Sequence, residues 1–363
     1  MSTLSLVLNS GRVITRAAVG AIALLVATAT LLSAQTATAA RPSVGKTVKV
    51  GPGVYEIAAS PSTGRIYVAV AGQRDQPGAS VVVLDGDTLD VVQTIDATSA
   101  APFGLGINDE TQTLYSSNTR DGSVSAIDLS TGRIVATMRT DEDPDAHLRE
   151  VIADEATNTV YVSSYGEAGR IWVIDGRTNT VSRVLQNVGD GTAGLVLDRA
   201  ANRLWTTNMA AGEVAAIDLT SHEVVERFPA GGERPSNLAL DAETGRLFVA
   251  NQGGSVTVLD STSGELLATV ETGEGALDVE FHPEANLVYA ANRVASTVTV
   301  FDGTSYEIIS QLETGGSPNT LAIDAASGLV YVTKKARPRA RGAGAPAPPP
   351  DDPHADTVTI IRP

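Results

Sequence analysis

The strongest constraint on the fold is a unit that recurs along the chain every 41 to 48 residues. One apolar run of each unit carries an aromatic residue, as in "RLFVAN", "RLWTTN" and "LVYAAN". The seven aromatic residues are Tyr67, Tyr115, Tyr161, Trp205, Phe248, Tyr289 and Tyr331. Seven copies of a unit of this length are typical of a β-propeller, in which each repeat builds one blade.

The fifth unit shows four runs of strand length, "NLALD", "LFVAN", "VTVLD" and "ELLATV". These runs are rich in β-branched, aromatic and Leu residues, and no helical periodicity follows the first forty residues. Helical repeats of similar period need long amphipathic helices, which are not indicated here. The sequence therefore predicts an all-β, seven-bladed propeller with four-stranded blades.

The seventh unit has only three such runs before the chain ends at Pro363. We expect the missing strand to come from "TVKV" at 47–50, so that the N-terminal strand pairs into the last blade and closes the ring. Closure leaves no open sheet edge at the seam. The propeller is predicted to span residues 45–363.

The first forty residues indicate export. Arg12 and Arg16 precede a long apolar run, and "ATA" at 37–39 offers the small residues of a cleavage site. We predict a signal peptide over residues 1–40, with an uncleaved membrane anchor as the alternative. The mature protein is then expected outside the cytoplasm, secreted or in the cell envelope, with no membrane span.

The runs "LFVAN", "VYAAN" and "LYSSN", each followed by a "VTVLD"-type strand, resemble the YVTN-repeat β-propeller family of exported bacterial proteins (YncE-like). The resemblance covers residues 45–363. It implies the fold and not an activity, because the motif marks strands. The seventh unit departs from the motif with Lys334, where Asn is usual, and the first unit departs from it with Val70.

The net charge of the chain is −16, and removal of residues 1–40 takes away two arginines, which leaves −18. Such an acidic balance argues against broad nucleic-acid binding, although some members of the family that the chain resembles bind nucleic acids. The absence of Cys excludes disulfides, thiolate catalysis and Cys-ligated zinc.

Many acidic residues close strands in turns such as "DLSTGR" and "DSTSGE", where Asp bonds to the backbone. These aspartates are Asp85, Asp128, Asp175, Asp218, Asp260, Asp302, Asp154, Asp198, Asp241 and Asp324. Their turns form one uniform rim of the propeller. The loops of the opposite rim vary from blade to blade, and variable loops on a rigid scaffold are where binding usually occurs.

We expect the residues that open the innermost strands to surround the mouth of the central channel on the variable rim. They are Tyr55, Glu56, Arg149, Glu150, Asn237, Asp278 and Asn319. Such a polar mouth could hold a small ligand or an ion. The alternative is a hydrated channel that binds nothing specific.

Asp141, Asp143 and Asp145 form a D-x-D-x-D pattern that resembles the start of a calcium loop. The Gly and Glu that complete such a loop are replaced by Ala146 and Ile152, so a solvated acidic loop is the alternative. No cofactor is otherwise expected.

The seventh unit contains a basic, Pro-rich insertion, which we predict to be flexible over 334–356. Its positive residues are Lys334, Lys335, Arg337, Arg339 and Arg341. They could form an arm for an anionic partner, which would be a cell-wall polymer, a phospholipid surface or nucleic acid, or they could belong to a merely solvated loop.

The sequence leaves three candidate functions for this protein. The first is an exported, non-enzymatic, monomeric propeller that binds a protein or a cell-envelope polymer through its variable rim. The second is a hydrolase or lactonase-like enzyme whose metal is held by Glu56, Glu150, Asn237 and Asp278. The third is polyanion binding through the basic arm.

Overall fold

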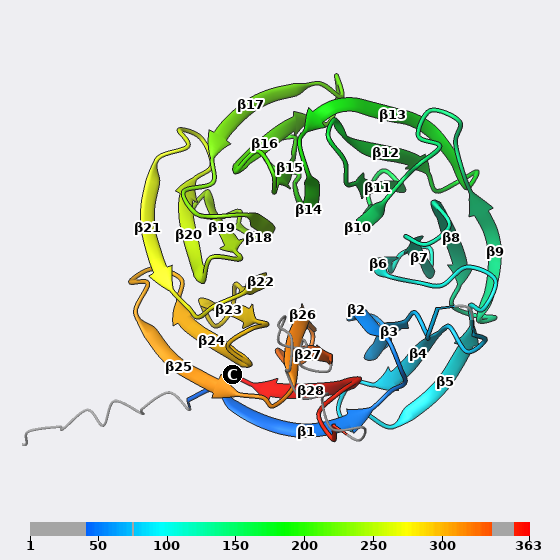
Figure 1. The fold of residues 1–363 in the computed structure, drawn as a ribbon, viewed down its shortest axis with the longest axis horizontal. Helices are drawn as coiled ribbons and strands as arrows, with labels where there is room; N and C mark the ends of the chain where they lie inside the picture. Colours follow the sequence, from blue (N-terminus) through cyan, green and yellow to red (C-terminus); the bar gives the residue numbers. More distant parts are fainter. Residues whose placement is uncertain (1–40, 75, 336–351) are drawn as a thin grey trace, which may run out of the picture. The chain divides into compact units, whose positions relative to one another are not determined.

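The computed structural model describes residues 41–74, 76–335 and 352–363. These residues belong to one compact unit, Ala40–Pro363. They form 28 strands in seven four-stranded antiparallel sheets, which stand as blades around a common axis (Figure 1). The predicted all-β, seven-bladed propeller is therefore confirmed.

The strands of each blade run in sequence order from the axis outward (Figure 1). Blade 1 contains β2 (Val54–Ser60), β3 (Arg65–Val70), β4 (Ser80–Asp85) and β5 (Val91–Asp96). Blade 2 contains β6 (Gly104–Asn108), β7 (Thr113–Asn118), β8 (Ser123–Asp128) and β9 (Arg133–Met138). Blade 3 contains β10 (Leu148–Asp154), β11 (Thr159–Ser164), β12 (Gly169–Asp175) and β13 (Thr180–Gly189). Blade 4 contains β14 (Thr192–Asp198), β15 (Arg203–Asn208), β16 (Glu213–Asp218) and β17 (Val224–Pro229).

The remaining blades follow the same order, except that the last one is built from both ends of the chain. Blade 5 contains β18 (Pro235–Asp241), β19 (Arg246–Asn251), β20 (Ser255–Asp260) and β21 (Leu266–Glu271). Blade 6 contains β22 (Ala276–His282), β23 (Leu287–Asn292), β24 (Thr297–Asp302) and β25 (Ile308–Glu313). Blade 7 contains β26 (Ser317–Ile323), β27 (Val330–Lys335), β28 (Thr357–Arg362) and β1 (Ser43–Lys49).

The hydrophobic core is divided into seven clusters, and each cluster joins two neighbouring blades. The second and third strands are buried along most of their length because a neighbour covers both of their faces. The outermost strands alternate between exposed and half-buried residues, as β17 does, because solvent covers one of their faces. The repeated aromatic residue of each second strand is buried in these clusters.

The two tryptophans are core residues, as expected from their places in strand runs. Trp172 is fully buried between blades 2 and 3, and Trp205 between blades 4 and 5. Neither indole ring is available as a cofactor platform.

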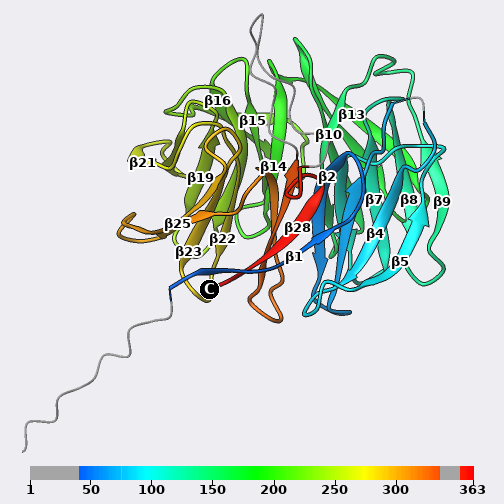
Figure 2. The ribbon, with the colours of Figure 1, turned by 60° about the horizontal axis from the view of Figure 1, so that its bottom comes forward.

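The ring is closed as predicted. β1 pairs antiparallel with β28, with Val48 opposite Val358, and the two strands lie side by side at the outside of blade 7 (Figure 2). The observed strand, Ser43–Lys49, begins earlier than the predicted one and ends one residue before Val50. Asp356 ties the seam together, because its carboxylate accepts hydrogen bonds from the backbone N–H groups of Gly53 and Val54.

In the part of the chain that the structure describes, no helix is long and apolar enough to cross a membrane.

Deletion of residues 43–49 should lower the Tm by roughly 10 °C or more, because β28 loses its partner and half-buried Val48 leaves the core between blades 1 and 7. Differential scanning calorimetry measures the change. Lys46→Ala is the matched control, since it removes only the exposed contacts of Lys46 with Asp90 and the Thr88 carbonyl and should shift the Tm by about 1 °C or less. Equal melting of the deletion variant and the parent protein would contradict closure through β1.

Candidate functional site

An irregularity near the start of the innermost strands brings side chains into the channel. The register between first and second strand shifts there in six of the seven blades, for example between Val54 and Ile57 of β2. Such a β-bulge breaks the usual alternation of side chains between the two faces. Consecutive residues such as Tyr55 and Glu56 can therefore both stand at the mouth of the channel.

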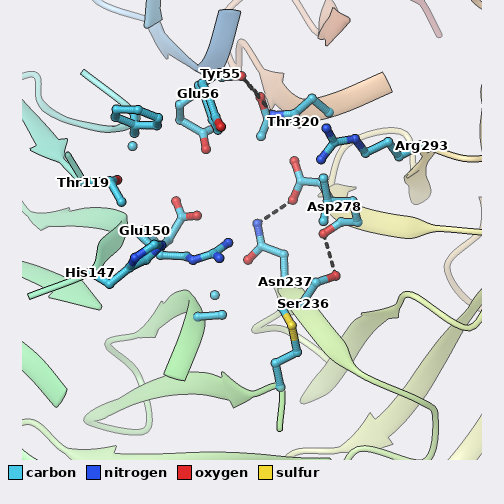
Figure 3. A pocket seen from close by; sticks show the side chains of 18 of the residues that line it. Tyr55, Glu56, Thr119, His147, Glu150, Ser236, Asn237, Asp278, Arg293 and Thr320 are labelled. Atoms are coloured by element: carbon cyan, nitrogen blue, oxygen red, sulfur yellow. Dashed lines mark hydrogen bonds between the residues drawn. The ribbon is translucent and has the colours of Figure 1, made fainter. Parts of the chain in front are cut away.

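The structure brings together all seven residues that were predicted at the mouth. They line one cavity of about 530 Å³, and most of them appear in Figure 3. A second cavity of about 370 Å³ shares Glu56, Glu150, Asn237 and Asp278 with the first, so the pocket continues along the channel. The position of these residues is as predicted, and their role in binding stays a prediction.

The loops of the variable rim complete the wall of the cavity. They add Arg74, Thr119, Arg120, His147, Met209 and Arg293. These residues come from the loops between second and third strands and from the crossover into blade 3. In blades 2 and 4 the innermost strand contributes Gly104 and Gly194, where an added Cβ would collide with the Arg149 carbonyl and the Asn237 side chain. These glycines let neighbouring innermost strands approach closely.

Asp278 is the hydrogen-bonded centre of the site. Its carboxylate accepts hydrogen bonds from the Asn237 side chain at 2.5 Å and from the N–H groups of Val279 and Leu321 at 2.9 and 2.6 Å. Across the mouth, Thr320 and Asn319 both donate to the carbonyl of Tyr55. Figure 3 shows the bonds of Asp278 with Asn237 and of Thr320 with Tyr55, which hold the walls in place around an open centre.

Four carboxyl groups face one another in the channel, and one of them, Glu280, was not predicted. Burial is the main cause that raises the pKa of each, and the charges of neighbouring acids add to it for Glu56, Glu150 and Glu280. The pKa of Glu150 rises to about 8, whereas that of Asp278 rises only to about 6 because three hydrogen bonds stabilise its ionised form. Near neutral pH, Asp278 is therefore ionised to a greater extent than Glu150.

Glu280 could have been found from the sequence. It lies two residues after Asp278 in β22, and alternate residues of a strand share a face. The pair "DVE" therefore points two carboxyl groups toward the same channel.

Cationic side chains gather at the outer end of the cavity, with aromatic rings beside them. Arg149 lies over the Tyr165 ring, Arg120 over Phe103, and Lys335 over Tyr55. The buried Nε of Arg293 has no hydrogen-bond partner. Among the ion pairs that join described residues, none includes Arg120, Arg149, Arg293 or Lys335.

The strand-ending aspartates are turn formers, as predicted. Asp260 accepts hydrogen bonds from the backbone N–H groups of Thr262 and Ser263, and Asp241 accepts them from Glu243 and Thr244. These bonds lower the pKa of the Asp260 carboxyl. The uniform rim is acidic because its turns need these side chains.

Of the three candidate calcium ligands, one is already engaged by the fold. Asp143 is buried and accepts hydrogen bonds from Trp172 Nε1 at 3.0 Å and from Arg170 at 3.1 Å, whereas Asp141 and Asp145 are exposed. Within residues 41–74, 76–335 and 352–363, no group of three or more His, Cys, Asp or Glu side chains is placed to hold a metal ion. Calcium binding here stays a prediction.

The prediction that the flexible basic insertion begins at Lys334 is wrong. Lys334 and Lys335 are the last residues of β27: Lys334 pairs with Thr357 of β28, and Lys335 pairs with Ser317 of β26. Lys334 is fully buried and donates a hydrogen bond to the Thr314 carbonyl at 2.6 Å. Arg337, Arg339 and Arg341 lie outside the described residues, and the predicted insertion ends earlier than expected, since Asp356 belongs to the seam.

The fold and its polar channel mouth define a seven-bladed β-propeller with a pocket on the variable rim. No family model matches the chain. Curated relatives do: the chain is 36% identical over 298 residues to a protein of Salmonella typhimurium (strain LT2) described as "Uncharacterized protein YncE", and it is equally similar to that of Escherichia coli (strain K12). Each match covers 79% of this chain and 84% of the relative. The chain belongs to the YncE family.

Replacing Glu150 by Gln should flatten the pH dependence of stability. Folding raises the pKa of Glu150 from 4.5 to about 8, so its protonated form contributes stability that is complete below pH 4.5 and is lost as pH rises to about 8. A glutamine side chain at this position does not titrate. Between pH 5 and pH 8 the Tm of the variant should therefore gain about 2 °C or more on the parent protein.

The exposed residue Glu243 on the uniform rim offers the matched control, Glu243→Gln. Its Tm should follow the parent protein at every pH. If the Tm of Glu150→Gln and that of the parent protein change with pH in parallel, Glu150 is ionised in the folded state.

Proposed function

We propose that this chain is an exported, non-enzymatic propeller that binds a small anionic ligand at its channel mouth. One observation carries the proposal: cationic side chains converge on the outer end of the cavity without forming ion pairs with described carboxylates. Arg293 is partly buried, and charged groups in such places are normally paired, whereas Arg120 and Arg149 are exposed. An anionic ligand would supply the missing partner.

The balance of charge inside the cavity supports an anion rather than a cation. Arg120, Arg149 and Arg293 stay charged, since a guanidinium does not lose its proton in proteins. Of the four channel acids, Glu56 and Glu280 have their pKa raised well above the usual value by burial and by neighbouring acids, and the pKa of Glu150 is raised to about 8, which lowers the negative charge of the channel. The mouth is therefore positive although the whole chain carries −16, and such a local potential attracts anions.

The unpaired donor of Arg293 points to a ligand or water in the site. A buried N–H group without a partner costs about 1–3 kcal/mol, so such groups are usually satisfied. Arg149 offers a planar set of donors that suits carboxylate or phosphate groups. A cavity of about 530 Å³ is the size of small-molecule pockets, which favours a small ligand over a polymer.

Arg149→Ala and Arg293→Ala should each lower the affinity for citrate about tenfold, because each substitution removes one charge-assisted contact with the anion. Isothermal titration calorimetry with citrate as the probe measures the affinity. Arg133→Ala removes an exposed arginine from the outermost strand of blade 2 and should bind citrate like the parent protein. Identical citrate titrations for all four proteins, or no citrate binding at all, would contradict an anion site at the mouth.

Export is supported by the basic residues, apolar run and small residues of the first forty positions. Expression of the full chain in a bacterial host should yield an extracytoplasmic protein that begins at Ala40 or Arg41. N-terminal sequencing of the fractionated protein tests this. Ala39→Leu should block the cleavage, because signal peptidase needs a small residue there. An intact N-terminus in the parent protein would favour the membrane anchor.

A further inference from the structure

A third cavity, of about 450 Å³, lies on the uniform rim between blades 3 and 4. Its walls come from the turns after β10 and β12 of blade 3 and from the turns after β14 and β16 of blade 4. It shares no lining residue with the two cavities of the channel. Its volume falls in the range of small-molecule pockets, so it is a candidate for a second, separate binding site.

Tyr161, the repeated aromatic residue of blade 3, lines this cavity. Its side chain is only 3% exposed, and no residue in the described part of the chain exchanges a hydrogen bond with its hydroxyl group. A tyrosine hydroxyl in such a place usually has a partner, because an unpaired polar group that is buried destabilises the fold. The cavity is the space from which a ligand could supply that partner.

The equivalent tyrosines of two other blades show which contact blade 3 lacks. Tyr115 of blade 2 donates a hydrogen bond to Asn179 Oδ1 at 3.3 Å, and Tyr331 of blade 7 donates one to the Gly86 carbonyl at 3.1 Å. Both acceptors lie in the turn between the third and fourth strands of the next blade. For Tyr161 that turn follows β16 of blade 4, and there it forms a wall of the cavity instead.

His222 takes the place of Asn179 in this turn of blade 4. Each of the two residues follows a strand-ending aspartate by four positions, and each has a positive φ, which is 60° at His222 and 52° at Asn179. His222 lines the cavity, and its ring forms no hydrogen bond with the residues that the structure describes. Two polar groups from different blades, the Tyr161 hydroxyl and the His222 imidazole, therefore line one cavity and are both available to a ligand.

The carboxylates and guanidinium groups of the cavity neutralise one another. Asp154 forms an ion pair with Arg199, and Asp175 forms one with Arg177 at 2.9 Å. An anion would meet the two carboxylates and a cation would meet the two guanidinium groups. A neutral ligand can use the donors and acceptors of both pairs without disturbing them.

Hydroxyl groups and a small apolar surface complete the walls. The hydroxyl groups belong to Thr157, Thr159, Ser182 and Thr220, and the apolar surface to Val173, Ile174 and Leu219. Hydroxyl groups both donate and accept hydrogen bonds. A sugar ring has donors and acceptors around its edge and C–H groups on its faces, so it matches both kinds of wall. A purely apolar ligand would leave the polar groups without partners.

We propose that the cavity between blades 3 and 4 binds the ring of a neutral sugar. A sugar oxygen accepts the hydrogen bond of the Tyr161 hydroxyl, and the His222 imidazole bonds to a neighbouring hydroxyl group of the sugar. This site is on the opposite rim from the channel mouth and does not depend on anion binding there.

Saturation-transfer difference NMR tests the proposal with glucose, galactose, mannose and N-acetylglucosamine as probes. At least one of these sugars should bind, and Tyr161→Phe should lower its affinity about tenfold, because the variant loses one hydrogen bond to the ligand. Tyr115→Phe is the matched control and should leave the affinity unchanged, since its hydroxyl lies between blades 2 and 3. Failure of all four sugars to bind, as expected if the cavity holds only water, overturns the proposal. So does equal affinity of Tyr161→Phe and the parent protein.

His222→Asn provides a second variant that should fold. Asparagine accepts the positive φ of this position, and it should give Tyr161 the acceptor that Asn179 gives to Tyr115. Sugar affinity should therefore fall about tenfold or more while the Tm does not fall. Undiminished sugar binding by this variant contradicts the proposed site.

Two cross-checks separate this site from the channel mouth. Tyr161→Phe should bind citrate like the parent protein, and Arg149→Ala should bind the sugar like the parent protein. Loss of sugar binding in Arg149→Ala would place the sugar at the mouth and overturn the site between blades 3 and 4. Sugar binding that depends on Tyr161 in a protein that does not bind citrate contradicts only the anion site.

Discussion

Packing between neighbouring blades is the interaction on which the whole structure depends. Each blade is a thin sheet whose two faces are both apolar, and all seven hydrophobic clusters lie between two blades. A fully buried Val, Leu or Phe side chain contributes roughly 1.5–3 kcal/mol, and a blade obtains this contribution only where a neighbour covers it. No blade can be the last of a row without exposing an apolar face. The ring must therefore close, and β1 completes blade 7 for this reason.

The same packing leaves the axis of the propeller for polar residues. The blades converge there, and the bulges of the innermost strands turn Glu56, Glu150, Asn237 and Asp278 into the channel. Because these groups are crowded in a partly dry space, the pKa values of Glu56, Glu150 and Glu280 are raised. The cations at the outer end are not neutralised by them. Separation of charge along the channel is thus a consequence of burial, and the proposed anion site lies at its cationic end.

Blade 7 combines the seam and the site. The chain leaves the mouth at the end of β27 and returns in β28, which pairs with the N-terminal strand. Lys335 stands at this exit and contacts Tyr55 of blade 1, so one residue joins the closure of the ring to the lining of the pocket. The family motif usually has Asn at position 334, and the departure that looked like the start of a flexible arm places a buried lysine, Lys334, and a half-buried one, Lys335, in the ring itself.

The sequence by itself determined the number of blades, the strands of each blade, the closure by the N-terminal strand and the turn role of the aspartates. All of these follow from local periodicity and turn chemistry, which act over a few residues or repeat at a fixed interval. It also located the seven mouth residues, because equivalent positions of repeated blades meet at one rim.

Only the tertiary structure decided which of these residues carry charge and which cations join them. Arg293, Arg120 and Lys335 come from different blades and loops, and no spacing in the sequence brings them together. Lys334 and Lys335 were misread for the same reason, since a run of basic residues looks solvated until burial against β26 and β28 is known. Protonation and accessibility depend on the groups that other blades place nearby, so they are properties of the closed ring and not of any one repeat.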